Sequence, residues 1–201
     1  MSTLTWYGYS AEVFVLSATG GLRWSATLGL SQGYEVGPIF AASDGGAYVA
    51  DESLDAVSRV SSDGDLVWTR RVPAQWFSEA QDSTLLVASC KGITSLQQDS
   101  GHMNWQQRLS FPLSRCEMSG FTAAVDGSLY ASVQIDPYSL ADSSRILKFD
   151  EFGKMAWQFD LPDPDARLLG VDADHVYFST PTRLSALDSD SGVLLWESNP
   201  Q

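Results

Sequence analysis

The chain has 201 residues, of which 44% are hydrophobic and 18% are charged, and its formal net charge is −13 at pH 7. A chain of this length and composition can bury a substantial core, and its low content of charged residues excludes an intrinsically disordered protein. The acidic balance argues against binding to nucleic acid or to an anionic membrane surface, because both require clustered Lys and Arg. No apolar run approaches the roughly 18 residues of a transmembrane helix, so membrane insertion is not expected.

The chain begins with MSTLTWYGYSAEV, which has neither the basic segment nor the apolar core of a signal peptide. This predicts a cytoplasmic protein, or a protein of the bacterial envelope if residue 1 is not the native start.

One sequence motif then recurs along the chain: a strand, a tight turn containing Gly, and a second strand that ends in Trp four residues after the Gly. It appears five times at intervals of 44, 37, 52 and 39 residues, which predicts a repeat architecture. The pairs are Gly20/Trp24, Gly64/Trp68, Gly101/Trp105, Gly153/Trp157 and Gly192/Trp196.

A second phrase lies between these copies, in which an Asp with small neighbours precedes a Tyr or Leu. Asp and Gly tolerate the backbone of tight hairpins, so Asp44, Asp82, Asp126 and Asp172 each predict a hairpin turn. Each unit therefore contains four short antiparallel strands in roughly 40 residues, which is the pattern of a β-propeller blade. The sequence predicts an all-β fold, a β-propeller of about five four-stranded blades.

The units are expected at residues 1–28, 37–72, 76–110, 119–161 and 167–197, within a single domain of residues 1–201. Trp6 and Tyr7 fall where the second strand of a blade belongs, so the first blade is expected to lack its inner strand. Two arrangements remain open: a ring closed by one three-stranded blade, or a piece of a longer repeat array. Open blade edges would favour a homodimer.

Aromatic residues in or beside the longest connections are the best indication of a binding surface. Tyr34, Trp76 and Tyr138 are expected to share one face, where their rings can anchor a protein or peptide, or stack on a carbohydrate or other small ligand. The alternative is that Trp76 and Phe77 simply begin a buried strand.

The two cysteines, Cys90 and Cys116, lack CxxC spacing. Two unpaired thiols are expected, with one disulfide bridge as the alternative.

No catalytic pattern is found. Asp188, Asp190 and Gly192 resemble the start of a Ca²⁺ loop, but Leu194 and the residues after it do not continue such a loop, so a capped turn is the expected reading. The two histidines are too far apart in the sequence to suggest a zinc site, and no nucleophile elbow or phosphate-binding Gly motif occurs. We therefore expect no enzymatic activity, no metal and no cofactor.

The phrase ALDSDSGVLLW resembles the repeat of the pyrroloquinoline-quinone-like (PQQ-like) propeller family, which matches Ala186, Leu187, Asp188, Gly192 and Trp196. The resemblance implies that the five Trp residues pack between adjacent blades. The family includes quinone-dependent dehydrogenases and non-enzymatic members of the BamB type. The vicinal Cys pair that the dehydrogenases share is absent, so the resemblance favours a non-enzymatic scaffold that binds a protein or peptide through one face.

Overall fold

The computed structural model describes residues 2–7, 10–29, 36–51, 54–80, 82–109, 116–135, 143–161, 163 and 165–198. Within these ranges the chain forms 19 strands in five antiparallel sheets, and no helix occurs there that is long and apolar enough to cross a membrane. The predicted all-β propeller architecture is confirmed.

The sheets follow one another along the chain and are numbered here in that order. Sheet 1 contains β1 (Ser2–Tyr7), β2 (Ser10–Leu16) and β3 (Leu22–Gly29). Sheet 2 contains β4 (Val36–Ala41), β5 (Ala47–Asp51), β6 (Ala56–Val60) and β7 (Leu66–Arg71). Sheet 3 contains β8 (Trp76–Glu79), β9 (Thr84–Ser89), β10 (Gly92–Gln97) and β11 (Met103–Arg108).

Sheet 4 contains β12 (Cys116–Ala123), β13 (Leu129–Ile135), β14 (Ser143–Phe149) and β15 (Met155–Leu161). Sheet 5 contains β16 (Arg167–Val171), β17 (His175–Thr180), β18 (Arg183–Asp188) and β19 (Leu194–Ser198). Each strand pairs with the next in the sequence, and sheet 1 has three strands where the others have four, as the sequence predicts.

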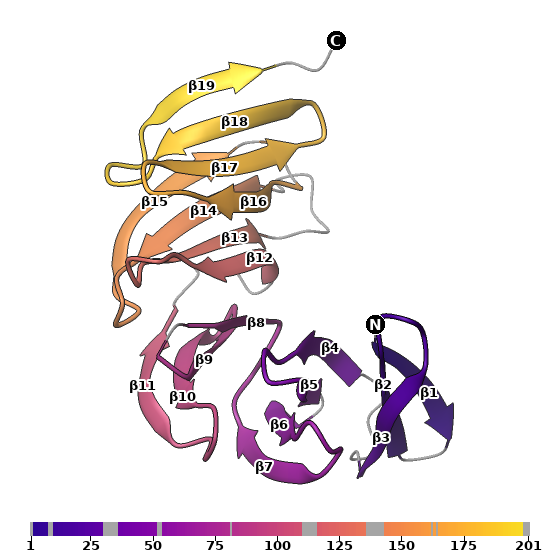
Figure 1. The fold of residues 1–201 in the computed structure, drawn as a ribbon. Helices are drawn as coiled ribbons and strands as arrows, with labels where there is room; N and C mark the ends of the chain where they lie inside the picture. The colour runs from indigo at the N-terminus through magenta and orange to yellow at the C-terminus, as the bar shows by residue number, and fades with distance from the viewer. Residues whose placement is uncertain are drawn as a thin grey trace.

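The five sheets lie along an arc, with sheets 1 and 5 at its two ends (Figure 1). Strands β8, β12 and β16 lie beside one another on the inner side of the arc, and β11 and β15 lie on its outer side (Figure 1). Whether residues 1–201 form one domain remains a prediction.

The core is divided among the joints between neighbouring sheets. Four apolar clusters occupy the four joints. In the joint between sheets 2 and 3, for example, Tyr48 and Val57 pack against Leu85 and Val87. Among the described residues no cluster joins sheet 5 to sheet 1, so the array is held together by contacts between successive sheets only.

Burial explains which strands read as apolar runs. The central strand β5 is buried at all five positions because sheets 1 and 3 cover its two faces. The outer strand β7 is exposed except at Trp68. The repeated Trp is the third residue of each outer strand, so the prediction that the strand ends at the Trp was wrong: each strand continues for at least two residues beyond it because backbone pairing extends past the bulge.

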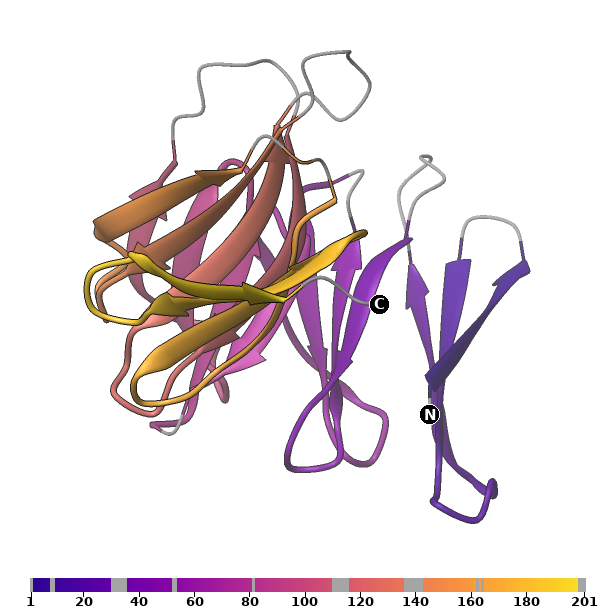
Figure 2. The same ribbon diagram turned by 90° about the horizontal axis from the view of Figure 1, so that it is seen from above.

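The connections divide between the two ends of each sheet. The first and third connections of a four-stranded blade lie at one end, called here the turn end, and the second connection and the link to the next blade lie at the other, the loop end. Figure 2 shows the turns of sheets 1 and 2 pointing to the same side of the array. The five repeated Gly residues all have positive φ, between 63° and 93°, in turns at the turn end.

Candidate functional site

A groove on the inner side of the arc contains the one predicted anchor that the structure describes. The groove has a volume of about 470 Å³ and is lined by β4, β8 and β12, with Phe40, Trp76, Phe77 and Phe121 among its residues. Trp76 is 38% exposed, whereas Phe77 is buried. Trp76 therefore begins strand β8 without being covered by it, and it combines the two readings that the sequence left open.

The orientation of Trp76 is held by a hydrogen bond. Its indole Nε1–H donates to the carbonyl oxygen of Met118 in sheet 4, at 2.7 Å. A side chain fixed in this way loses little further rotational freedom on binding, which is the property of a rigid aromatic anchor. Tyr34 and Tyr138, the other predicted anchors, lie outside the described residues.

A disulfide ties sheets 3 and 4 together at the same loop end. Cys90 and Cys116 are bonded, with their Cα atoms 5.9 Å apart, so the prediction of two unpaired thiols was wrong. Cys90 follows β9 and Cys116 begins β12, and the antiparallel topology brings both positions to the loop end of adjacent sheets. The 26-residue separation could not reveal this without the order of the sheets. The bond stabilises the joint against which Trp76 is oriented.

At the turn end, the repeated Trp of each of the first four sheets packs against the turn Gly of the following sheet. A Cβ atom added at Gly101 would lie 2.7 Å from the ring of Trp68, and one added at Gly192 would lie 2.7 Å from the ring of Trp157. Only Gly leaves room for the ring to approach the backbone so closely. A Cβ atom added at Gly153 would lie 2.6 Å from the ring of Trp105, and one added at Gly64 would lie 3.4 Å from Trp24, which is a looser contact.

The two ends of the array lack this contact. Trp196 in β19 is 40% exposed, and a Cβ atom at Gly20 in sheet 1 would meet nothing within 4 Å. The repeated Trp–Gly contact is therefore made at the four joints between successive sheets, and its two halves are separately exposed at the ends.

In the joint between sheets 2 and 3 a cation fills the space beside the Trp. Arg59 lies opposite Trp68 on β6, its guanidinium is 4.6 Å from the ring centroid of Tyr48, and it forms an ion pair with Asp44. Burial alone would raise the pKa of Asp44, but the Gly46 N–H and the Arg59 guanidinium together hold it below its ordinary value.

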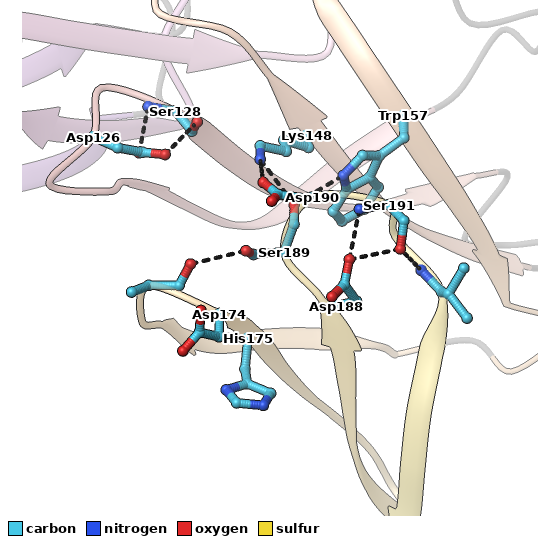
Figure 3. A network of polar contacts seen from close by, with 12 residues as sticks. Asp126, Ser128, Lys148, Trp157, Asp174, His175, Asp188, Ser189, Asp190 and Ser191 are labelled. Atoms are coloured by element: carbon cyan, nitrogen blue, oxygen red, sulfur yellow. Dashed lines mark hydrogen bonds and ion pairs between the residues drawn. The ribbon is translucent and has the colours of Figure 1, made fainter.

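The joint between sheets 4 and 5 repeats this arrangement with a lysine. Lys148 lies opposite Trp157, 5.6 Å from the ring centroid of Tyr130, and it donates to the Ser189 carbonyl oxygen at 2.8 Å. The indole N–H of Trp157 donates to the same carbonyl at 3.1 Å, and Asp190 lies 3.5 Å from the Lys148 ammonium group. Figure 3 shows these side chains converging on the turn of sheet 5.

The joint between sheets 3 and 4 differs, because it is open. A cleft of about 590 Å³ lies at its turn end, lined by Leu86, Ser95 and Trp105 of sheet 3 and by the turns of sheet 4. Ser95 stands opposite Trp105, in the position of Arg59 and Lys148, and Leu86 stands in the position of Tyr48 and Tyr130. Comparing the repeats position by position would have revealed this exception from the sequence.

The predicted hairpin at Asp172 is stabilised by a set of hydrogen bonds to its carboxylate. The carboxylate of Asp172 accepts the backbone N–H groups of Asp174 and His175, at 2.9 and 2.8 Å, and the Tyr177 hydroxyl at 2.9 Å. The Asp174 N–H and then the Tyr177 hydroxyl are the main reasons that the pKa of Asp172 is lowered to about 2. These bonds stabilise the turn, as the recurrence of Asp at this position predicts.

The candidate Ca²⁺ loop is also a stabilised turn. Asp188 accepts the backbone N–H and the hydroxyl of Ser191, at 2.8 and 2.6 Å, and Asp190 is engaged with Lys148. Within the part of the chain that the structure describes, no group of three or more His, Cys, Asp or Glu side chains is arranged to hold a metal ion.

Comparison with known proteins agrees with this architecture. The family model described as outer membrane protein assembly factor BamB matches residues 10–137, which is more than half of the chain. The sequence has no match among curated proteins.

Several solved structures share the fold. BamB from Moraxella catarrhalis superposes with a TM-score of 0.64 at 21% identity, over 95% of this chain and 58% of the BamB chain. Virginiamycin B lyase from Staphylococcus aureus gives a TM-score of 0.65 at 16% identity, over 96% of this chain and 64% of the lyase. Dihydro-heme d1 dehydrogenase NirN gives 0.63 at 12% identity, over 94% of this chain and 42% of NirN. The chain thus spans less than two thirds of each of these proteins, and at such identities the similarity concerns the fold alone.

Proposed function

We propose that this chain, which belongs to the family described as outer membrane protein assembly factor BamB, is a non-enzymatic propeller scaffold that binds a protein or peptide. The fold alone does not decide this, because enzymes share it. The proposal therefore depends on the residues of the inner groove.

The observation that carries the proposal is the exposed and oriented ring of Trp76. It lies in a groove of about 470 Å³ that three successive inner strands line, and such a groove suits an extended segment with apolar side chains. Trp is enriched among the residues that dominate binding energy at protein interfaces. The net charge of −13 favours a segment that also carries Lys or Arg.

The test begins with peptides selected for binding to the 201-residue chain from a random display library. Their affinities are then measured for the wild type, for Trp76→Ala and for Trp196→Ala. Trp196 is a matched control because it is 40% exposed, close to the 38% of Trp76, but lies on the outer strand of sheet 5. We expect Trp76→Ala to weaken binding by at least about 30-fold, which corresponds to the roughly 2 kcal/mol of a binding hot spot.

Equal effects of the two substitutions, or no loss of affinity in Trp76→Ala, would contradict the assignment of this groove. A carbohydrate array is probed in parallel with the same variants. Specific glycan binding that Trp76→Ala abolishes, in the absence of any selected peptide, would favour the carbohydrate-binding alternative over the scaffold.

A further inference from the structure

In three of the four joints, a positively charged side chain lies at the turn end. Between sheets 1 and 2, a guanidinium nitrogen of Arg23 lies 3.5 Å from the position that a Cβ atom at Gly45 would take. Between sheets 2 and 3, Arg59 is 4% exposed and pairs with Asp44. Between sheets 4 and 5, Lys148 is 8% exposed and donates to the turn of the next sheet. The positive charge is buried in the second and fourth joints, whereas Arg23 in the first joint is exposed.

The joint between sheets 3 and 4 has neutral residues at three positions that carry a cation in another joint. Asn104 precedes Trp105 as Arg23 precedes Trp24, and Ser95 stands opposite Trp105 as Arg59 stands opposite Trp68. Two residues after the Trp, Gln107 replaces Arg70, whose guanidinium donates to the Gly101 carbonyl oxygen at 2.8 Å in the preceding joint.

This joint nevertheless has carboxylates at the positions that correspond to the cation partners of the other joints. Asp82 is the hairpin residue that corresponds to Asp44, the partner of Arg59, and Glu151 precedes the turn Gly by two residues as Asp190 does beside Lys148. Both line the cleft, and neither forms a hydrogen bond or ion pair within the described ranges. A third carboxylate, Asp126, accepts the Ser128 N–H and hydroxyl at 2.9 and 3.0 Å.

The cleft is also large enough to bind a small molecule. Its volume of about 590 Å³ lies within the range of roughly 300–1,000 Å³ that small-molecule sites occupy. Leu86, Trp105 and Leu129 supply its apolar wall, and Gln97 and Asn104 add amide groups. Substitution of the large side chains by Leu86 and Ser95 therefore leaves a cavity with a ring on one side and two unpaired carboxylates at the rim.

We propose that this cleft binds an organic cation, an amine or guanidine carried on an apolar stem, in the place where the neighbouring joints hold their own Arg59 and Lys148. The stem packs against Leu86 and the face of Trp105, and the cation pairs with Asp82 and Glu151. The same chemistry is offered by a free small amine and by a Lys or Arg side chain of a polypeptide. The site lies at the turn end, whereas Trp76 stands at the loop end of β8, and Ala123 lines both this cleft and the inner groove.

The test follows the ¹⁵N-labelled indole signals of the protein by NMR during titration. The probes are n-pentylamine, n-butylguanidine and the neutral 1-pentanol, together with the capped tripeptides acetyl-Ala-Lys-Ala-amide and acetyl-Ala-Arg-Ala-amide. We expect the two cations to shift the Trp105 signal saturably and 1-pentanol to leave it unchanged. Binding of the tripeptides at equal or higher affinity identifies a polypeptide as the source, and binding of the free cations alone identifies a small amine.

Three variants locate the effect. Ser95→Lys places an ammonium group where sheet 4 has Lys148, so it should abolish the titration and raise the thermal unfolding temperature without ligand. Asp82→Asn combined with Glu151→Gln should weaken cation binding at least 10-fold. The control, Asp63→Asn combined with Asp65→Asn, removes the same charge from the turn of sheet 2 and should change affinity less than twofold.

The proposal is overturned if the wild-type Trp105 signal shows no saturable shift up to 50 mM of either cation (about the limit at which weak sites can still be followed). It is also overturned if 1-pentanol shifts the signal as the amines do, since this would indicate an apolar cavity without selectivity for charge. An equal loss of affinity in the control variant would show attraction by the net negative charge rather than by this site.

Discussion

The Trp–Gly contact makes a quantitative prediction, because the same side chain occurs in a covered and an uncovered setting. Trp68 is 7% exposed, lies against Gly101 of the next sheet, and donates its indole N–H to the Gln98 carbonyl oxygen at 2.9 Å. Trp196 occupies the same strand position but is 40% exposed. Truncation to Ala therefore removes a full joint contact in one case and a partly solvated side chain in the other.

We expect Trp68→Ala to lower the free energy of unfolding by about 3–5 kcal/mol, the usual cost of a large cavity in a core. Trp196→Ala should cost about 1 kcal/mol or less, because this residue is already 40% exposed and does not pack against a turn Gly. In urea unfolding followed by circular dichroism, with a slope of about 3 kcal/mol/M, the first substitution shifts the midpoint by about 1–1.7 M and the second by about 0.3 M or less. Equal shifts in the two variants would refute the conclusion that the joints are stabilised by these contacts.

Three further predictions concern other features of the array. Reduction, or substitution of Cys90 and Cys116 by Ser, should cost about 3.5 kcal/mol by the loop-entropy relation for a 26-residue separation, and the unfolded, unreduced protein should show no free thiol in a colorimetric thiol assay. Gly153→Ala should destabilise the protein strongly in thermal unfolding, since its φ is +77° and its Cβ would lie 2.6 Å from an aromatic ring; Gly170→Ala is the control, because its Cβ would meet nothing within 4 Å, and a similar effect of both would count against the close approach. The pKa of Asp172 should be about 2 by NMR titration of its carboxyl carbon. Because this lies below the value of 3.8 for a free side chain, the contribution of Asp172 to stability is present above about pH 4 and is lost as the pH falls toward 2. A measured pKa near 3.8 would contradict the hydrogen bonds assigned to this carboxylate.

The repeats determined the fold class by themselves. A turn Gly in each copy and an Asp at each predicted hairpin are local features, and local backbone preferences suffice to specify strands and turns. The three-stranded first sheet also followed from the spacing of Trp6 and Tyr7 relative to the first turn.

Positions that depend on the joint between two sheets were decided by the tertiary structure. The disulfide between Cys90 and Cys116 needs the two residues to reach the same end of adjacent sheets, and nothing in their separation indicates this. Trp76 was recognised as an aromatic beside a connection, but its hydrogen bond to Met118 and its place in the inner groove come from the packing of sheet 3 on sheet 4.

The open cleft at Ser95 shows the same division. The sequence by itself determined that Ser95 occurs where two other repeats have Arg59 and Lys148, since this is a matter of repeat position. That the exchange creates a cavity, and that Asp82 and Glu151 face it unpaired, was decided only by the tertiary structure. The physical reason is that strands and turns are specified by neighbouring residues, whereas a joint is filled or left open by side chains from two sheets together.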